Sequence, residues 1–328
     1  MTHRAFASFL LMSSAALLVA CSSGGSVTSP PVTTTPPPTQ NPPNPPTVTQ
    51  RTWFDEAYGA QADQRLDLFL PPTGNGPFRL IIWVHGGGWR NGTKTLAASA
   101  FQRRALSQGF ALATVGYRLS GVAKWPAQIH DVKGAVRFLR ANARRFALDS
   151  TRFGAWGLSA GAHLVSLLGT SGGIAVVEGT VGGNAGTSSR VQAVADWFGP
   201  TDFLQMDAGL VTAGCNPPGT VEQGLATSES SQLLGAAIGL VPNLVAQANP
   251  ITYITPDDPP FLIHQGTADC TVPFTQSVIF DTALRGPAGI GTGNVSLTLI
   301  TGAGHGGTQF TNDTNVDKVI AFFNQVLR

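Results

Sequence analysis

Continuous apolar runs alternate with longer amphipathic segments along residues 51–328. A short run without a polar interruption is typical of a strand that is covered on both faces of a sheet. We predict such strands at residues 80–84, 110–115, 191–198, 261–263 and 295–300. In segment 66–70 leucine recurs at every second position (Leu66, Leu68 and Leu70), and the segment stops at two prolines, which predicts an edge strand. The alternation predicts an α/β fold with a mostly parallel central sheet and helices on both faces.

The clearest amphipathic pattern begins at Pro126 and predicts a helix packed against the sheet. Its apolar stripe recurs at spacings of three and four: Ile129, Val132, Val136, Leu139, Ala143 and Phe146. Charged residues occupy much of the remaining helix, where we expect an outer surface: Asp131, Lys133, Arg137, Arg140 and Arg144. A similar stripe over residues 316–327 predicts a final helix. Both helices are expected to cover the core, and neither points to a function.

Two segments interrupt the alternation of strands and helices. Residues 171–190 are rich in glycine, serine and threonine, and residues 205–250 are irregular. Long excursions of this kind within a compact domain are usually functional or flexible. We therefore expect these segments to form a cap or a wall of a binding pocket.

The N-terminal residues predict export and lipid attachment. Residues 1–20 combine a short polar start with an apolar run that is too short to span a bilayer, which is typical of a signal peptide. The run ends Leu-Val-Ala-Cys and resembles the lipobox of bacterial lipoproteins, in which Cys21 is acylated. We expect a lipid anchor in the bacterial cell envelope, and Ser22 favours the outer membrane. The alternative is ordinary cleavage after Ala20, which leaves a secreted protein with a free thiol.

Residues 21–50 begin with this cysteine and continue as a proline- and threonine-rich stretch without charged residues. Such a composition cannot bury a core and stays extended, so we predict a linker. Residues 51–328 are assigned to one catalytic domain.

The net charge and the spacing of residues that could bind a metal argue against several classes of partner and cofactor. Twenty basic and eighteen acidic residues leave a net charge of +2, and no run of lysine or arginine is present. Nucleic-acid binding is therefore not expected, and membrane contact is expected only through the anchor. No cysteine and histidine spacing typical of zinc and no calcium loop occurs, so we expect neither a metal nor another cofactor.

The most informative motif is Gly157-Leu158-Ser159-Ala160-Gly161. A G-x-S-x-G sequence forms the turn between strand and helix that raises a serine side chain above an α/β sheet. Here a strand-like segment, 152–156, precedes the motif and a helix-like segment, 160–168, follows it. We predict that Ser159 is a nucleophile; the alternative is a buried structural serine.

A serine nucleophile needs a base, and an acid that orients the base. The chain order serine, acid, base places the base in the glycine loop after strand 295–300, at His305. The acid is expected after the preceding strand, at Asp269. Asp202, one strand earlier, is the competitor, which we expect to brace a turn. His264 ends a strand and is expected to anchor a loop by hydrogen bonds.

The sequence His85-Gly86-Gly87-Gly88-Trp89 directly follows the buried strand at 80–84. Its glycines leave backbone N–H groups free to bind a carbonyl oxygen, and the N–H of Ala160 would complete this oxyanion hole. The alternative is a tight turn with spare glycines. Trp89 is expected either to line the substrate pocket or to pack in the core.

Cys215 and Cys270 remain after the anchor cysteine is set aside. Export implies an oxidising compartment, where the two remaining cysteines are expected to form one disulfide. Because Cys270 directly follows Asp269, the bridge would clamp the loop of the acid to the segment around Cys215. The alternative is a pair of buried thiols.

The motifs together resemble α/β-hydrolase esterases of the hormone-sensitive-lipase-like and feruloyl/acetyl-xylan esterase groups. The segments that carry the likeness are His85–Trp89, Gly157–Leu164, His264–Pro273 and Gly304–Gly306, with Tyr117–Leu119 and Trp125–Val132. The resemblance spans roughly residues 60–328 and implies an α/β-hydrolase fold. It also implies a triad of Ser159, Asp269 and His305. The implied oxyanion donors are Gly87, Gly88 and Ala160.

The resemblance implies a serine carboxylesterase that hydrolyses short-chain acyl or hydroxycinnamoyl esters, free or linked to polysaccharide, through an acyl-enzyme. The chain departs from the lipase-like members because it lacks an obvious N-terminal helical cap and carries the excursion at 205–250. These departures leave the substrate pocket open. Two alternatives also stay open: an amidase or peptidase of the same fold (arylformamidase or prolyl-oligopeptidase type), and a non-catalytic surface-binding lipoprotein.

Overall fold

A central β-sheet organises the residues that the computed structural model describes, 48–95 and 100–328. The strands are β1 Thr52–Ala57, β2 Arg65–Phe69, β3 Phe78–Val84, β4 Ala111–Val115, β5 Leu148–Leu158, β6 Ala193–Trp197, β7 Phe261–Gly266 and β8 Val295–Ile300. Their order in the sheet is β1-β2-β4-β3-β5-β6-β7-β8. β2 runs antiparallel to β1 and β4, whereas every pairing from β4 to β8 is parallel. The predicted, mostly parallel sheet is confirmed.

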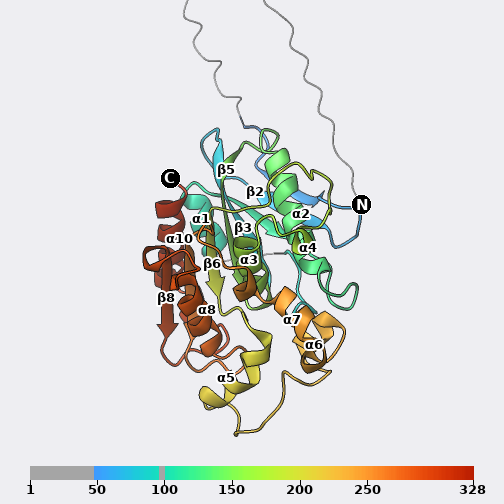
Figure 1. Cartoon of the computed structure of the whole chain (residues 1–328). Helices are drawn as coiled ribbons and strands as arrows, with labels where there is room; N and C mark the ends of the chain where they lie inside the picture. The colour runs from blue at the N-terminus through green and yellow to red at the C-terminus, as the bar shows by residue number, and fades with distance from the viewer. Residues whose placement is uncertain (1–47, 96–99) are drawn as a thin grey trace, which may run out of the picture. The chain divides into compact units, whose positions relative to one another are not determined.

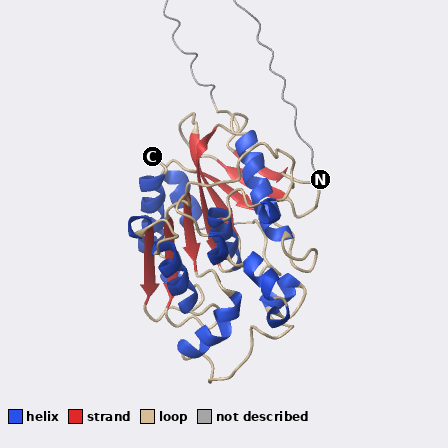
Figure 2. Ribbon diagram, in the orientation of Figure 1, coloured by secondary structure: helices blue, strands red, loops and turns tan. Residues whose placement is uncertain are grey.

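Helices cover both faces of this sheet (Figures 1 and 2). The α-helices are α1 Ala100–Ser107, α2 Ala127–Ala141, α3 Ala160–Thr170, α4 Ala175–Glu178, α5 Met206–Thr212, α6 Glu229–Leu234, α7 Pro242–Ala248, α8 Thr275–Arg285, α9 Thr308–Thr311 and α10 Asp313–Val326. Short 3₁₀ turns are η1 Phe203–Gln205, η2 Ile238–Leu240, η3 Pro250–Tyr253 and η4 Thr292–Asn294. α1 and α10 share one apolar core, and α2, α3 and α8 share the core on the other face. The expected three-layer arrangement is confirmed.

The prediction that segment 66–70 is an edge strand is wrong. β1 lies outside β2, with Trp53 paired to Leu68, so β2 is an interior strand. β1 has the sequence Thr-Trp-Phe-Asp-Glu-Ala and mostly exposed or half-buried side chains. An outer strand of this kind has no apolar run that would identify it from the sequence.

The helix predicted from Pro126 is shorter than its apolar stripe. α2 ends at Ala141, and Asn142 is its C-terminal cap. Ala143 and Phe146 lie in the turn beyond this helix, where both are buried. A turn that packs against the core can extend an apolar stripe past the end of a helix, so the stripe overestimates its length.

Of the five charged residues expected on the outer surface, Arg140 is half-buried and Arg144 is exposed, but Asp131, Lys133 and Arg137 are buried. Lys133 is fully buried and Arg137 is 1% exposed. The segment 171–190 covers this side of the helix, and Glu178 pairs with both cations: Nζ of Lys133 lies 2.9 Å from Oε2, and Nη1 of Arg137 lies 2.7 Å from Oε1. Nζ of Lys133 also donates to the carbonyl oxygen of Ser171 at 2.6 Å. Buried charges persist in this way only when partners satisfy them.

Asp131 is the third buried charge of α2 and faces the other flank of the helix. Its carboxylate accepts from Nε and Nη2 of Arg118 at 2.8 and 2.7 Å, and from Nε2 of Gln64 at 2.7 Å. These contacts fix the loop after β4 to α2. Within the described ranges, no helix has both the length and the apolar run that crossing a bilayer requires. The signal peptide, the anchor at Cys21 and most of the linker lie outside those ranges.

Candidate active site

Ser159 occupies the sharp turn between β5 and α3. Its φ of 54° and ψ of −124° are rare for a residue with a side chain, and such strain is characteristic of functional turns. The flanking glycines are required by space. A Cβ atom on Gly157 would lie 2.4 Å from the carbonyl oxygen of Gly161, and one on Gly161 would lie 2.2 Å from that of Val84. The strand–turn–helix context predicted for the motif is present.

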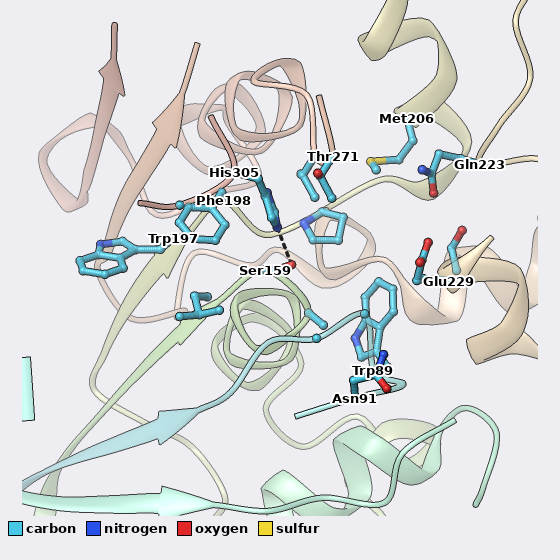
Figure 3. Close-up of a pocket in the computed structure, with 18 of the residues that line it drawn as sticks. Trp89, Asn91, Ser159, Trp197, Phe198, Met206, Gln223, Glu229, Thr271 and His305 are labelled. Carbon is cyan, nitrogen blue, oxygen red and sulfur yellow. Dashed lines mark hydrogen bonds between the residues drawn. The ribbon is translucent and has the colours of Figure 1, made fainter. Parts of the chain in front are cut away.

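The structure brings Ser159, His305 and Asp269 together, although they are far apart in the sequence. Oγ of Ser159 lies 2.8 Å from Nε2 of His305 (Figure 3). Nδ1 of the same ring lies 2.7 Å from Oδ2 of Asp269. With the proton on Nδ1, the ring donates to the carboxylate and accepts from the serine hydroxyl. This arrangement can withdraw a proton from Ser159 and stabilise the resulting imidazolium.

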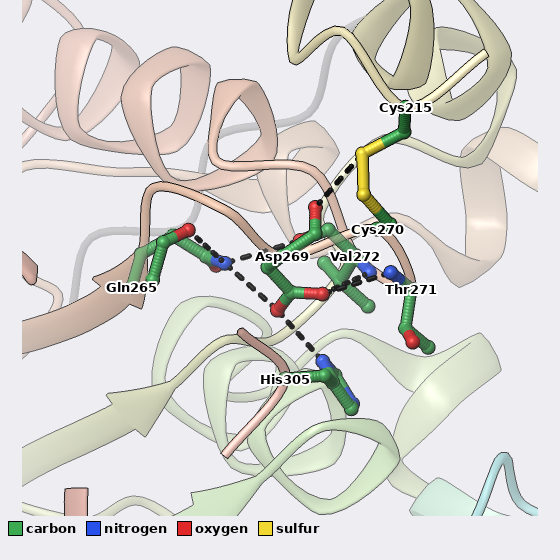
Figure 4. The surroundings of a disulfide bond; sticks show 8 residues. Cys215, Gln265, Asp269, Cys270, Thr271, Val272 and His305 are labelled. Carbon is green, nitrogen blue, oxygen red and sulfur yellow. Dashed lines mark hydrogen bonds and ion pairs between the residues drawn. A yellow bond between two sulfur atoms is a disulfide. The ribbon is translucent and has the colours of Figure 1, made fainter. Parts of the chain in front are cut away.

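Asp269 is fully buried, and its carboxylate oxygens are held by several donors (Figure 4). Oδ1 accepts from the backbone N–H groups of Thr271 and Val272 at 2.8 and 2.9 Å. Oδ2 accepts from Nε2 of Gln265 at 3.0 Å in addition to the ring of His305. A buried carboxylate with this set of donors is satisfied and cannot rotate freely. Gln265, which the sequence analysis did not identify, therefore positions the acid.

The predicted disulfide between Cys215 and Cys270 is present, with their Cα atoms 5.5 Å apart (Figure 4). Cys270 directly follows Asp269, and Cys215 lies just after α5. The bridge therefore ties the loop of the acid to the segment that follows β6. The alternative of two unpaired thiols is wrong.

The glycine turn after β3 lies beside Ser159. Gly87 and Gly88 have φ values of +104° and +58°, and both line the same pocket as Ser159 and Ala160. Ala160 is the first residue of α3, so its backbone N–H group belongs to the unpaired end of a helix. The backbone N–H groups of Gly87, Gly88 and Ala160 are suited to bind a negatively charged oxygen at Ser159.

Trp89 both packs in the core and lines the pocket, so the two roles considered for it coexist. Its side chain is 4% exposed, and Nε1 donates to Nδ1 of His163 at 3.1 Å. The indole ring also lies edge-on to Phe203, with centroids 5.4 Å apart. Trp89 is therefore a rigid wall of the pocket.

The pocket around Ser159 has a volume of about 440 Å³. Trp197 and Phe198 line one side, and Leu158 also contributes to the lining (Figure 3). Residues 205–250 contribute Met206, Gln223 and Glu229 to the other side (Figure 3), and Ser230 of the same segment also lines the pocket. The expectation of a pocket wall is confirmed for this segment. It is wrong for residues 171–190, because none of them lines the pocket and they cover α2 instead.

Phe198 is a site residue that the sequence analysis missed. Its ring lies edge-on to that of His305, with centroids 4.7 Å apart, and its φ is +50°. The left-handed backbone directs a large side chain against the imidazole. No motif marks this position, although it follows β6 at the same end of the sheet as Ser159 and Asp269.

Two other predicted roles have different outcomes. Asp202 braces a turn as expected, since Oδ1 accepts from the backbone N–H of Leu204 and from Nδ2 of Asn249. The prediction that His264 anchors a loop is wrong. Its ring is fully buried, and neither nitrogen has a hydrogen-bond partner among the described residues. The ring faces Trp197 in a nearly parallel stack instead, because His264 points into the apolar core rather than toward the loops.

No group of three histidine, cysteine, aspartate or glutamate residues within 48–95 and 100–328 is placed to hold a metal ion.

Known proteins resemble this chain in both sequence and structure. Esterase LipC of Mycobacterium tuberculosis is 28% identical over 253 residues, which are 76% of this chain and 58% of LipC. Esterase LipQ of the same organism is 29% identical over 226 residues, 69% of this chain and 49% of LipQ. The chain thus spans about half the length of these curated relatives.

Two solved structures have a similar fold. A bifunctional GH43-CE protein of Bacteroides eggerthii is 35% identical with a TM-score of 0.76, covering 86% of this chain and 36% of that protein. A truncated carbohydrate esterase from gut microbiota is 29% identical with a TM-score of 0.75, covering 87% of this chain and 99% of that one. The predicted α/β-hydrolase fold is confirmed. The family model BD-FAE matches residues 66–284, well over half of the sequence, and the chain therefore belongs to the BD-FAE family.

Proposed function

We propose that this protein is a serine carboxylesterase with Ser159 as nucleophile, His305 as base and Asp269 as the acid that orients the base. The observation that carries the proposal is the continuous set of hydrogen bonds from Oγ of Ser159 through His305 to Asp269. The names of the curated relatives, which are esterases, support the same chemistry. A scaffold used only for binding would have no need of this alignment or of the strained serine.

In the proposed first half-reaction, Oγ of Ser159 attacks the ester carbonyl carbon while its proton passes to Nε2 of His305. The carbonyl oxygen becomes negatively charged and accepts from the N–H groups of Gly87, Gly88 and Ala160. The bond between carbon and the alcohol oxygen then breaks. The imidazolium returns its proton to that oxygen, so that a neutral alcohol leaves.

In the second half-reaction, water replaces the alcohol. Nε2 of His305 takes a proton from water as the water oxygen bonds to the acyl carbon, and the same N–H groups hold the oxyanion. The bond between the acyl carbon and Oγ breaks, and His305 returns the proton to Ser159. Asp269 remains ionised and stabilises the imidazolium in both half-reactions. The net reaction consumes one ester and one water and releases an acid and an alcohol.

The proposed substrates are short-chain acyl or hydroxycinnamoyl esters of a sugar or polysaccharide. The carbohydrate esterase from gut microbiota, similar to this chain over nearly its whole length, supports a sugar ester. The pocket of about 440 Å³ has room for a small acyl group and a sugar ring.

The test compares wild-type protein with Ser159→Ala on p-nitrophenyl acetate and on its amide counterpart, p-nitroacetanilide. We expect the wild type to prefer the ester, and Ser159→Ala to lose at least about a thousandfold in kcat with an unchanged melting temperature. Ser107→Ala, at the exposed end of α1, is the matched control. A fully active Ser159→Ala protein, or a wild type that a fluorophosphonate does not label, would refute the proposal. A preference for the amide would assign the site to amide hydrolysis.

We also propose that Cys21 is acylated and holds the enzyme at the bacterial cell envelope, where ester-bearing polymers outside the cell are accessible. The lipobox-like sequence before Cys21 supports this. Incorporation of labelled palmitate into the wild type but not into Cys21→Ser is the expected result.

A further inference from the structure

Several polar side chains in the pocket have no partner among the described residues. The amides of Asn91 and Gln223 and the carboxylate of Glu229 line the mouth of the pocket without a hydrogen bond or ion pair from residues 48–95 and 100–328. Asn91 and Glu229 are exposed and Gln223 is half-buried, so water hydrates these groups before a substrate binds. Figure 3 shows all three with Trp89 on one side of Ser159. Such groups lose hydration when a substrate covers them, so they favour a substrate that supplies matching hydrogen bonds.

Glu229 lies directly on the glycine turn that flanks Ser159. A Cβ atom on Gly88 would lie only 2.7 Å from Cγ of Glu229 and 3.3 Å from its Cβ. The aliphatic part of Glu229 therefore covers Gly88, and its carboxylate reaches the pocket close to where the oxyanion forms. An unpaired negative charge in this position opposes the developing oxyanion. Because Glu229 is exposed, water hydrates its carboxylate in the free protein, and a substrate that covers it must bring donors in place of that water.

The segment that carries Gln223 is held in place before any substrate binds. The carboxylate of Asp207 accepts from the backbone N–H groups of Glu222, Gln223 and Gly224 at 2.9, 2.8 and 3.1 Å. The disulfide at Cys215 ties the same segment to the loop of the acid. The backbone that carries Gln223 is thus preorganised, which reduces the entropic cost of ordering this part of the pocket on binding.

We propose that Glu229 is a specificity-determining residue that binds hydroxyl groups on the alcohol part of the ester, together with Gln223 and Asn91. The proposal rests on the esterase function above and specifies a polyhydroxylated ring as the leaving alcohol. Amides both donate and accept, and a carboxylate accepts from two hydroxyls, so the set matches neighbouring sugar hydroxyls better than a lone cation. Trp197 and Phe198, across Ser159, are left to hold the acyl group.

The test uses two acetate esters of similar size: a methyl xylopyranoside carrying one acetyl group, and cyclohexyl acetate, which lacks hydroxyls. Acetate release gives kcat/KM for wild type, Glu229→Gln and Glu229→Ala. For the sugar ester we expect a loss of about ten- to a hundredfold in Glu229→Ala and a smaller loss in Glu229→Gln. For cyclohexyl acetate we expect an increase of up to a few-fold in both variants, because the charge near the oxyanion is removed.

Glu222→Gln is the matched control, since it removes the same charge from the same segment without lining the pocket. It should leave the ratio of the two kcat/KM values unchanged. An equal change on both esters in the Glu229 variants, at unchanged melting temperature, would overturn the role of Glu229 while leaving the esterase function intact. A wild type that cleaves neither ester would overturn both.

Discussion

Replacing His264 by leucine is expected to make the fold less sensitive to acid. The imidazole is fully buried in β7, and neither ring nitrogen has a partner among the described residues. Burial lowers the pKa of His264 to about 4, and the charge of Lys318 acts in the same direction. The folded protein therefore holds this ring in its neutral form, whereas the unfolded chain can protonate it.

The size of the effect follows from the two pKa values. An unperturbed histidine titrates near pH 6.5, and each pKa unit corresponds to about 1.4 kcal/mol. Because the folded-state pKa of His264 is depressed, its contribution to stability is complete above about pH 6.5 and is lost as pH falls toward 4. The expected loss is about 3 kcal/mol, a large fraction of the stability of an ordinary domain.

The assay is urea unfolding followed by tryptophan fluorescence at about pH 7.5 and about pH 4.5. At neutral pH we expect His264→Leu to lie within about 1.5 kcal/mol of wild type, because removal of two unpaired polar atoms offsets the change in shape. At acid pH the variant should gain about 2–3 kcal/mol relative to wild type. Asp196, whose pKa burial raises to about 6, acts in the opposite sense but is present in both proteins.

His163 provides the contrasting variant. It is also buried, and burial lowers its pKa to about 3, but it accepts from Trp89 and donates from Nε2 to the carbonyl oxygen of Ala248. His163→Leu should therefore lose about 1–3 kcal/mol already at neutral pH, because it leaves buried partners unsatisfied. If wild type and His264→Leu lost the same stability between the two pH values, the assignment of acid sensitivity to His264 would be refuted.

Two further predictions follow from the disulfide and from the buried charges. The double variant Cys215→Ser/Cys270→Ser should lose about 2–4 kcal/mol of unfolding free energy, because the unfolded chain is no longer restricted by a bridge between residues 55 positions apart. It should also lose part of its kcat, because the segment of Asp269 is held less firmly. An unchanged kcat would show that Asp269 is held without the bridge. Glu178→Gln should lose about 3 kcal/mol in urea unfolding, because Lys133 and Arg137 stay buried with a weaker partner. Glu56→Gln, which removes a pair at the surface with Arg145, is its control and should lose less than about 1 kcal/mol; equal losses would contradict the reasoning.

The triad could be predicted because each member lies where the fold restricts the choice. Ser159 is marked by glycines that space alone requires, and His305 follows a strand whose end must face the same edge of the sheet. Asp269 was chosen over Asp202 by chain order, and the contacts of the two residues agree with that choice. Information of this kind is local and therefore readable in the sequence.

Other features depend on contacts between distant segments, which no local pattern records. Lys133 looks like an ordinary outer residue of a helix until Glu178 is known to cover it. His264 looks like a strand end near a loop, although its ring nitrogens have no hydrogen-bond partner in the described part of the chain. Asn91 and Glu229 lie far apart in the sequence and belong to no common motif. For Glu229, only the irregular composition of residues 205–250 indicated that its segment contributes to the pocket.

The segment between β6 and β7 supplies one wall of the pocket, but the strand order and the contact between Ser159 and His305 depend on other parts of the chain. Mutations in this segment can therefore change which alcohol is recognised without changing the residues proposed to carry out the reaction. Grafting the corresponding insertion from a relative would exchange selectivity in a single step, provided that the graft preserves a cysteine to meet Cys270.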